Sequence, residues 1–329
     1  SYPNAAIAFA STSGEIASNN VYDHSIVSLA IWFEKSTVKT VETDVRQHKS
    51  SYEAGVFLRN AFPDKDLKNI FVLSDGTLVN GSELVKGLNH SEASEVLITG
   101  GLAGDADRFQ QTFAGLNAIP QPGKIVAIGF YGEALQVGSG SLGGWDEFGP
   151  EREITASDKN ILHAIDHKNA LELYKEYLGP FKNELPSSAL LFPLSISGEN
   201  QDQKLVRTIL SIDEASGTMT FAGNMPVGSK VRLMKANFDK IIDASASVAK
   251  QILDKQNAPE VAILISCVGR KLILRDRAYE EIVAARQVMG EQVIISGFYS
   301  YGEISPATDL TLACELHNQT MTITTFREI

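Results

Sequence analysis

The sequence predicts an α/β and α+β fold, with two lobes of mixed β-sheets flanked by helices. Short apolar runs alternate with amphipathic stretches of helical period, which is typical of strands and helices that feed a common sheet. Two similar segments, AAIAFASTSGEI at 5–16 and VIISGFYSYGEI at 293–304, each end an apolar run with a turn and Gly-Glu-Ile. They indicate an internal pseudo-repeat with related corners, although shared turn chemistry explains so short a match equally well.

Length and composition favour an ordinary globular protein. The chain has 329 residues, 43% hydrophobic and 21% charged, which suits two domains. A net charge of −11 without a basic stripe argues against partners such as nucleic acid or anionic membranes. No apolar run is long enough for membrane insertion and no leader is visible, so we expect a cytoplasmic protein. The sequence leaves open whether an N-terminal segment is missing.

In the first half, periodicity and turn residues predict strands and helices in alternation. The helix that opens at Gly81 has Ser82 as a candidate N-cap, and the glycine-rich stretch 138–150 is expected to be a loop. The predicted strands are 25–33, 70–73, 96–99 and 124–131, and the predicted helices are 52–61 and 81–88.

The second half begins after a predicted helix over 164–178, which Gly179-Pro180 ends. We place the junction at 181–187, between a domain of residues 1–180 and a domain of residues 181–329. Asn237 caps a long helix, and a second helix covers 279–289. The predicted strands are 188–196, 205–212, 218–222, 229–235, 261–266, 293–296, 310–316 and 320–326.

Short motifs occur in order along the whole chain. They are Ser74-Asp75-Gly76, Gly100–Asp105, Gly144-Trp145, Gly149-Pro150, Val206-Arg207, Pro226–Ser229, Ser266–Arg270, Gly297–Ile304 and His317–Thr320. This ordered set resembles the FIST sensory proteins, with an N-terminal and a C-terminal FIST region. The resemblance implies a signal-input module that binds a small-molecule ligand, amino acids among those proposed. The family that the chain resembles includes the NosP branch, whose members bind haem and report nitric oxide to partner histidine kinases.

The chain departs from the family pattern at two places. Family members usually start with an extra strand and helix before the segment that matches 5–16, so the first sheet either lacks an edge strand or is completed by a partner. Many members also have His just before the Gly-Trp pair, where this chain has Gly143. Any ligand bond that this His makes in relatives is therefore not available here.

One group of candidate ligand contacts suits a zwitterion. Arg270 follows a buried strand, and a guanidinium there can hold a carboxylate by two parallel hydrogen bonds. Tyr299, Tyr301 and Glu303 alternate along the chain, so we expect them on one side, with Glu303 placed to receive an ammonium group. The alternative is that these residues have structural roles. Arg270 would then form an internal ion pair with Glu303 or Asp276, and the tyrosines would lie at the edge of an ordinary core.

Further candidate contacts have weaker signals. Gly100–Asp105 resembles a backbone nest for an anion, or is a plain turn. Trp145 is either a lid over a pocket or a packed loop anchor, and Asn318 also suits backbone bonding in a turn. These further ligand-binding candidates are Cys267, Gly302, Asn318, Glu15, Gly101, Asp105 and Trp145.

An enzyme would need a nucleophile, and Cys267 is the candidate because a nearby arginine can lower a thiol pKa. No histidine lies close to it in sequence, and no Gly-x-Ser-x-Gly elbow occurs. Two buried, inert thiols, Cys267 and Cys314, are the alternative. We therefore expect a sensor rather than an enzyme.

Haem b is the cofactor to consider, because one axial histidine suffices to hold it. The candidate ligands are His317, His24 and His163. His163 and His167 also have metal-pair spacing at a helix start, or form a solvated polar face. The expected function is a sensor that binds a small ligand and closes about the 181–187 linker to signal through a separate protein such as a histidine kinase. A haem-based nitric-oxide sensor is the alternative.

Overall fold

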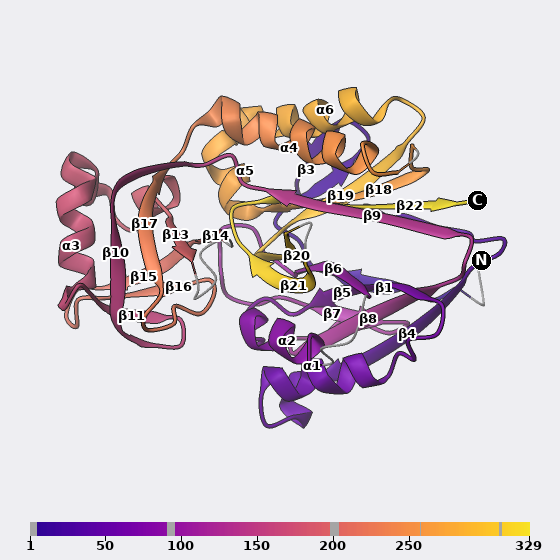
Figure 1. The fold of residues 1–329 in the computed structure, drawn as a ribbon, viewed down its shortest axis with the longest axis horizontal. Coiled ribbons are helices and arrows are strands. Elements are labelled where there is room, and N and C mark those ends of the chain that lie inside the picture. Colours follow the sequence, from indigo (N-terminus) through magenta and orange to yellow (C-terminus); the bar gives the residue numbers. More distant parts are fainter. Residues whose placement is uncertain (1–4, 91–95, 198–203, 257, 309–310) are drawn as a thin grey trace.

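The structure is a computed structural model that describes residues 5–90, 96–197, 204–256, 258–308 and 311–329. Two six-stranded sheets lie face to face, and helices cover the outer face of each (Figure 1). Apolar side chains from both sheets, such as Phe71, Phe130, Phe298 and Phe326, fill the space between them. The result is a four-layer core with helices outside and sheets inside.

The first sheet has the strand order β21-β20-β6-β5-β8-β4. Helices α1 (Ser51–Asn60) and α2 (Gly81–Leu88) pack on its outer face, where Leu58 and Leu84 are fully buried. Its strands are β4 (Thr37–Asp44), β5 (Leu67–Ser74), β6 (Leu97–Leu102), β8 (Lys124–Tyr131), β20 (Gly302–Thr308) and β21 (Thr311–His317). Two short strands, β1 (Ala8–Ala10) and β7 (Ala114–Leu116), pair separately.

The second sheet has the order β3-β2-β19-β18-β22-β9. Helices α4 (Phe238–Leu253) and α6 (Ala278–Met289) cover its outer face, and α5 (Val268–Leu274) follows β18 directly. Its strands are β2 (Glu15–Ala17), β3 (Asn20–Tyr22), β9 (Leu135–Leu142), β18 (Val261–Cys267), β19 (Ile294–Ser300) and β22 (Met321–Glu328).

Residues 146–235 form a third body, here called the inserted unit, at one end of the four-layer core (Figure 1). It has its own eight-stranded sheet and its own apolar core around α3 (Ala170–Leu178). Two 3-10 helices, Gly179–Glu184 and Ser187–Leu191, lie within it. Its strands are β10 (Asp146–Asp158), β11 (Ile161–Ile165), β12 (Lys168–Asn169), β13 (Leu194–Ser197), β14 (Lys204–Arg207), β15 (Ile209–Asp213), β16 (Thr218–Phe221) and β17 (Lys230–Lys235).

The two six-stranded sheets are built as a repeat. Read from edge to edge, their strands have the same order and the same directions. The Gly-Glu-Ile corners start equivalent strands: Glu15 pairs with Phe298, and Glu303 pairs with Gly101. A Cβ at Gly100 or at Gly297 would clash with the facing carbonyl of the neighbouring parallel strand. The register therefore confirms the predicted pseudo-repeat.

The repeat exchanges strands between its halves. The hairpin β2–β3, from the start of the chain, pairs with β19, whereas β20–β21, from its end, pairs with β6. Strand β9 likewise pairs with β22 along eight residue positions. Each sheet thus combines strands from both sides of the predicted junction at residue 181, and the division into 1–180 and 181–329 stays a prediction.

Two predicted elements are wrong. Residues 25–33 form no strand, although Phe33 packs on Phe130. The predicted loop at 138–150 contains parts of β9 and β10, because glycines there let a helix lie close to the sheet: a Cβ at Gly140 would be 3.0 Å from Val248 of α4. Position 310, the start of the predicted strand 310–316, lies outside the described residues.

The helix predicted over 164–178 begins later, at Ala170. Residues up to Ile165 belong to β11, and a turn with positive φ at Asp166 and His167 follows. Asn169 is the N-cap, with its side chain accepting from the Glu172 N–H at 3.0 Å. The spacing Asn-x-x-Glu was a readable start signal. Helix α2 likewise is capped by Asn80 rather than Ser82.

The predicted linker at 181–187 is not a connection between lobes, because it lies inside the inserted unit between α3 and β13. The chain enters and leaves the unit at Asp146 and Lys235, which pair with each other on β10 and β17. None of the helices in the described ranges is both long and apolar enough to cross a membrane.

Candidate functional site

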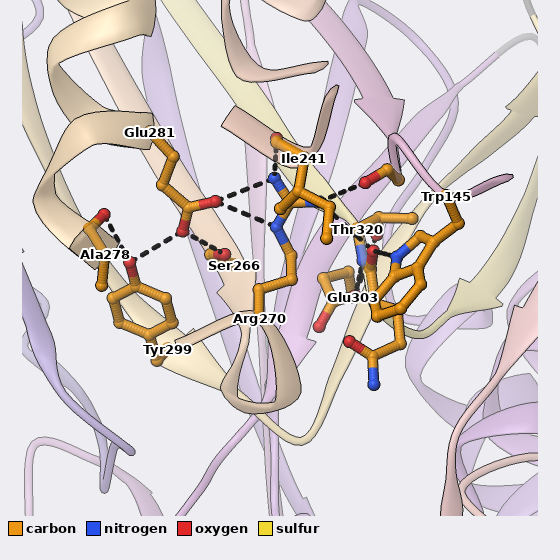
Figure 2. Close-up of polar contacts among 11 residues, drawn as sticks. Trp145, Ile241, Ser266, Arg270, Ala278, Glu281, Tyr299, Glu303 and Thr320 are labelled. Carbon is orange, nitrogen blue, oxygen red and sulfur yellow. Dashed lines mark hydrogen bonds and ion pairs between the residues drawn. The ribbon is translucent and has the colours of Figure 1, made fainter. Parts of the chain in front are cut away.

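Arg270 lies in a fully buried ion pair at the start of α5 (Figure 2). Its Nε and Nη2 donate to Oε2 of Glu281 on α6, at 3.0 and 2.8 Å. Ser266 and Tyr299 donate to Oε1 of the same carboxylate, at 2.8 and 2.7 Å. These four donors offset much of the desolvation of the buried pair. The internal partner of Arg270 is therefore Glu281, and not the predicted Glu303 or Asp276.

The other N–H groups of Arg270 donate to backbone carbonyls. Nη1 reaches the carbonyls of Gly143 and Gln319 at 2.6 and 3.4 Å, and Nη2 reaches that of Ile241 at 2.6 Å. All five guanidinium N–H groups are thus used inside the protein. Gly143 precedes the inserted unit and Ile241 follows it, so Arg270 ties both chain connections of the unit to the core.

Glu303 is fully buried at the start of β20. Ser300 donates to its Oε1 at 2.7 Å, and Thr320 donates to Oε2 from its hydroxyl at 2.8 Å and from its N–H at 3.2 Å. Burial raises the pKa of Glu303 to about 8, although these donors oppose the shift. The predicted contact of Glu303 with a ligand ammonium is not the arrangement here, because the carboxyl faces its own turn.

Glu15 occupies the same place in the first corner. The Thr12 hydroxyl donates to its Oε1, and Ser25 donates to Oε2 from its hydroxyl at 2.7 Å and its N–H at 3.3 Å. As at Glu303, one oxygen accepts from a hydroxyl three residues earlier, and the other accepts a hydroxyl and an N–H from one later residue. Both glutamates serve as caps of equivalent turns.

Tyr299 and Tyr301 lie on different sides of the molecule, which corrects the expectation that both share one side with Glu303. Tyr299 belongs to the core under α4 and α6, and Tyr301 to the core under α1 and α2. The chain leaves β19 at Ser300 and enters β20, in the other sheet, at Gly302. The two tyrosines therefore do not belong to one strand, and the alternation of side chains along a strand does not apply to them. Burial raises the pKa of each phenol. The charge of Glu281 adds to the shift at Tyr299, and the hydrogen bond to Asp105 adds to it at Tyr301.

A cavity of about 370 Å³ lies where the inserted unit meets the first sheet. Its walls combine apolar and polar groups, among them the side chains of Thr77, Asn80 and Asn160. The core contributes Gly76, Thr77, Leu78, Val79, Asn80, Gly81, Leu102, Phe109 and Tyr301, and the inserted unit contributes Asn160, Leu210, Phe221, Ala222 and Gly223. A small molecule in this space would contact both bodies, as expected of a ligand site between domains.

Two buried aspartates shape the core side of the cavity. Asp75 accepts the N–H groups of Thr77 and Leu78, at 2.8 and 2.6 Å, and so fixes the loop before α2. Asp105 accepts the Tyr301 hydroxyl and backbone N–H groups of the following loop. That loop places Phe109 on the Tyr301 ring, with centroids 4.7 Å apart. Of the predicted candidates, Tyr301 therefore lines the cavity, and Asp105 holds Tyr301 in place.

Asn224 joins the inserted unit to the N-terminus of α2. Its Oδ1 accepts from Asn80 at 3.2 Å, its Nδ2 donates to Glu83 at 2.8 Å, and its N–H donates to Ser82 at 3.1 Å. These three bonds join the inserted unit to the core next to the lining residues Asn80 and Gly223. Sequence reasoning missed Asn224, and no local pattern marks it, because its partners are more than 140 positions away.

Arg207 is the charged residue next to the cavity, and the sequence singled it out only as part of a family motif. It is 4% exposed, and burial lowers its pKa to about 10. Nη1 donates to the Leu316 carbonyl at 2.8 Å and to that of Val206 at 3.3 Å, while Nε donates to the Asn224 carbonyl at 3.3 Å. The guanidinium stays protonated at neutral pH and bridges the inserted unit and β21.

The remaining predicted contacts lie elsewhere. Gly101 of β6 pairs with Glu303, and Gly302 of β20 pairs with Leu102. The first part of the predicted anion nest, Gly100–Leu102, is therefore strand. The Trp145 indole donates to the Gln319 carbonyl at 2.9 Å and packs against the α4 side of the core, as a loop anchor. Asn318 is buried, and its amide has no hydrogen-bond partner among the described residues, contrary to the expected backbone bonding.

Cys267 is 2% exposed at the end of β18. Burial raises the pKa of its thiol, and the neighbouring Glu303 adds to the shift. A catalytic thiol needs the opposite change. The environment therefore does not activate Cys267 as a nucleophile.

The histidines do not fit a haem site at this cavity, since none of them is among its lining residues in the described part of the chain. His317 is buried, its Nε2 is 3.1 Å from the Ser305 carbonyl, and burial lowers its pKa to about 4. His24 and His163 are exposed, and His163 lies on β11 rather than on a helix. No group of three potential metal ligands occurs in the described ranges.

Comparison with protein families matches the FIST N domain to residues 1–168 and the FIST C domain to residues 170–306. The chain belongs to the FIST family. FIST domains are sensory domains that bind small ligands. The two FIST regions meet inside the inserted unit, so the walls of the cavity come from both.

No curated protein matches the chain. Among solved structures, it is similar to a cyanuric acid hydrolase from A. caulinodans, with 10% sequence identity and a TM-score of 0.20 over 89% of this chain and 99% of the hydrolase chain. A likeness this weak indicates neither a fold nor an activity.

Proposed function

We propose that this FIST protein is a cytoplasmic sensor that binds a small metabolite in the cavity between the inserted unit and the core. The observation that supports the proposal is the cavity itself, about 370 Å³ and lined from both bodies. Amino acids are the first candidate ligands, and the output passes to a separate partner such as a histidine kinase. Nothing among the described residues favours the haem alternative.

The proposed mechanism is a change in how the inserted unit sits on the core. Its two connections lie side by side at Asp146 and Lys235, and Arg270 holds the backbone on both sides of them. The Asn224 contacts join the unit to the start of α2. A ligand that touches both bodies favours the closed arrangement by its differential affinity for it.

The test is a thermal-shift screen of the twenty amino acids and common small metabolites against three proteins. Ala222→Phe fills the cavity, and Ala215→Phe, on an exposed hairpin turn, is the matched control. At a concentration of 100 times its Kd, a ligand should stabilise the wild type and Ala215→Phe by about 2.7 kcal/mol. It should not stabilise Ala222→Phe.

The proposal fails if no compound stabilises the wild type, or if the stabilisation is the same in Ala222→Phe. A haemin titration is run beside the screen. A saturable Soret band that is the same in the wild type and in Ala222→Phe would indicate that the protein binds haem at a site outside this cavity.

A further inference from the structure

Phe109 brings an aromatic ring to the cavity from a strained backbone position. The residue lines the cavity and is 42% exposed. Its φ of 51° lies in the left-handed region, which a bulky side chain adopts only where the surrounding structure enforces it. Ala106, three residues earlier in the same loop, also has a positive φ, of 66°. Because backbone strain of this kind is concentrated at functional sites, the placement of this ring is a candidate functional feature.

Hydrogen bonds hold the loop and the Phe109 ring in place. The Phe109 N–H donates to the Tyr301 hydroxyl at 3.1 Å, and that hydroxyl also contacts the Ala106 carbonyl, at 3.2 Å, and Asp105. One face of the Phe109 ring stacks on Tyr301, with an interplanar angle of 17°. The ring is thus oriented before a ligand binds, which lowers the entropic cost of binding. Tyr301 covers one face, and the exposed remainder of the ring is available for a second aromatic contact.

The walls of the cavity favour an uncharged ligand group. Among the described residues that line the cavity, none carries a charged side chain. Three of them, Leu78, Phe109 and Leu210, are exposed large apolar residues. Burying a charge without a partner is unfavourable, whereas covering these side chains with an apolar ring is favourable. A free amino acid would therefore have to keep its charged groups in solvent.

The Asn160 side chain offers a hydrogen-bond acceptor to such a ring. Its Nδ2 donates to the Phe221 carbonyl at 2.9 Å, and the Phe221 N–H donates to the Asn160 carbonyl at 2.8 Å. Its Oδ1 accepts no hydrogen bond from the described residues. By contrast, the side chains of Thr77 and Asn80 already bond within the protein. A ligand N–H group therefore suits Oδ1 of Asn160.

We propose that the ligand of this cavity carries an uncharged planar ring with an N–H group, as indole does. The ring stacks on Phe109, and its N–H donates to Oδ1 of Asn160. The inference rests on the proposed function and names the ligand class of the same site. It is supported by the strained, preorganised Phe109 ring, by the free acceptor, and by the lack of charged side chains among the described lining residues.

The first experiment titrates the unaltered protein with indole and with benzofuran by isothermal calorimetry. The two rings have nearly the same shape, but benzofuran has an oxygen in place of the N–H group. Indole should bind about fivefold more tightly, because it alone can donate to Asn160 and a neutral hydrogen bond has a modest net effect. Equal binding of the two rings, or tighter binding of benzofuran, overturns the proposal.

A charged analogue tests the second part of the ligand class. Indole-3-carboxylate should bind more weakly than indole, because no charged side chain among the described lining residues can pair with its carboxylate. Tighter binding of the carboxylate overturns the assignment of an uncharged ligand.

The failure of this inference can be told apart from that of the proposed function. If indole does not bind at millimolar concentration, although the metabolite screen finds a ligand that Ala222→Phe excludes, the inference alone fails. If indole does not bind and the screen also finds nothing, both fail.

Variants assign the two contacts. Phe109→Leu keeps an apolar side chain but removes the aromatic face, and it should bind indole about fivefold more weakly than the wild type. Phe238→Leu is the matched control, because Phe238 is similarly exposed, lies at the first position of α4 and is not a lining residue. It should bind indole as the wild type does. Equal affinities in both variants contradict the stacking contact.

Asn160→Ala should abolish the preference for indole over benzofuran. A general loss of stability would weaken the binding of both rings and leave their ratio unchanged, so the ratio reports the hydrogen bond itself. An unchanged preference in Asn160→Ala contradicts the proposal. If a variant does not fold, the comparison of indole with benzofuran in the wild type still decides.

Discussion

At the scale of single residues, the Arg270–Glu281 pair stabilises the fold where the inserted unit joins the core. Replacing Arg270 by Met leaves the Glu281 carboxylate buried without its cation, although Tyr299 and Ser266 remain as donors. We expect a loss of about 3–5 kcal/mol in the free energy of unfolding, measured by urea denaturation. Arg277→Met, which removes an exposed ion pair, should change little. A similar loss in the free energy of unfolding in both variants would show that the buried pair stabilises the fold no more than the exposed one.

Glu303 should make stability depend on pH in the neutral range. Its pKa is raised to about 8 in the folded protein, whereas in the unfolded chain it is about 4.3. The folded state thus keeps a proton that the unfolded state loses. The resulting stability is fully present below about pH 4 and is lost as the pH rises to about 8, by an amount on the order of 5 kcal/mol.

Glu303→Gln removes this titration, and the variant should lose less stability than the wild type between pH 5 and pH 8. Denaturant unfolding at each pH measures the difference. Glu15→Gln, at the equivalent position of the first corner and partly exposed, is the matched control and should follow the wild type. A Glu303→Gln curve parallel to that of the wild type would contradict the buried, protonated carboxyl.

These residues show what a sequence reveals about a site and what it does not. The position of Arg270 after a buried strand, and the option of an internal ion pair, were readable. Its partner Glu281 was not, because that choice depends on how α6 packs over β18. Arg207 had no local signal of its own, since its surroundings come from Leu316 and Asn224, which the fold brings together.

At the scale of elements, the contact between Asn224 and α2 should control the cavity. Asn224→Ala removes two side-chain hydrogen bonds that connect the inserted unit to the start of α2. We expect faster amide hydrogen exchange at 79–83 and 222–225, and a several-fold loss in ligand affinity. Mass spectrometry of exchanged peptides measures the first effect.

Asn169→Ala is the control for this variant, because it removes the N-cap of α3 on the same unit. It should cost about 1 kcal/mol of stability and leave exchange at 79–83 unchanged. If both variants speed exchange equally at 79–83, the effect is general loosening of the unit and not release of a specific contact.

Element prediction succeeded where local chemistry dominates. Asn237 caps α4 as expected, and the strand at 124–131 has the predicted bounds. It failed where tertiary packing decides. Glycines of β9 form a strand because α4 lies close above them. The predicted strand 25–33 has no strand to pair with, and Ile26 and Trp32 within it are exposed.

At the scale of the whole molecule, the exchanged hairpins make the two halves dependent on each other. Fragments 1–169 and 170–329, produced separately, each lose the strands that complete their sheet, and exposed strand edges favour aggregation. We expect neither fragment to fold alone, and we expect a mixture to regain a native circular dichroism spectrum. Cooperative unfolding of either isolated fragment would instead support two independent domains.

Ligand binding in the cavity is tested most directly by methyl NMR of leucine-labelled protein, titrated with the most stabilising compound of the metabolite screen. The account predicts saturable shifts for Leu102 on the core wall and Leu210 on the inserted unit. The methyl signals of Leu264, which lies on β18 and packs under the helices that cover the second sheet, should not shift. Saturable shifts that spare Leu102 and Leu210 and appear at Leu264 would place the ligand near Arg270 and contradict the cavity as the sensory site.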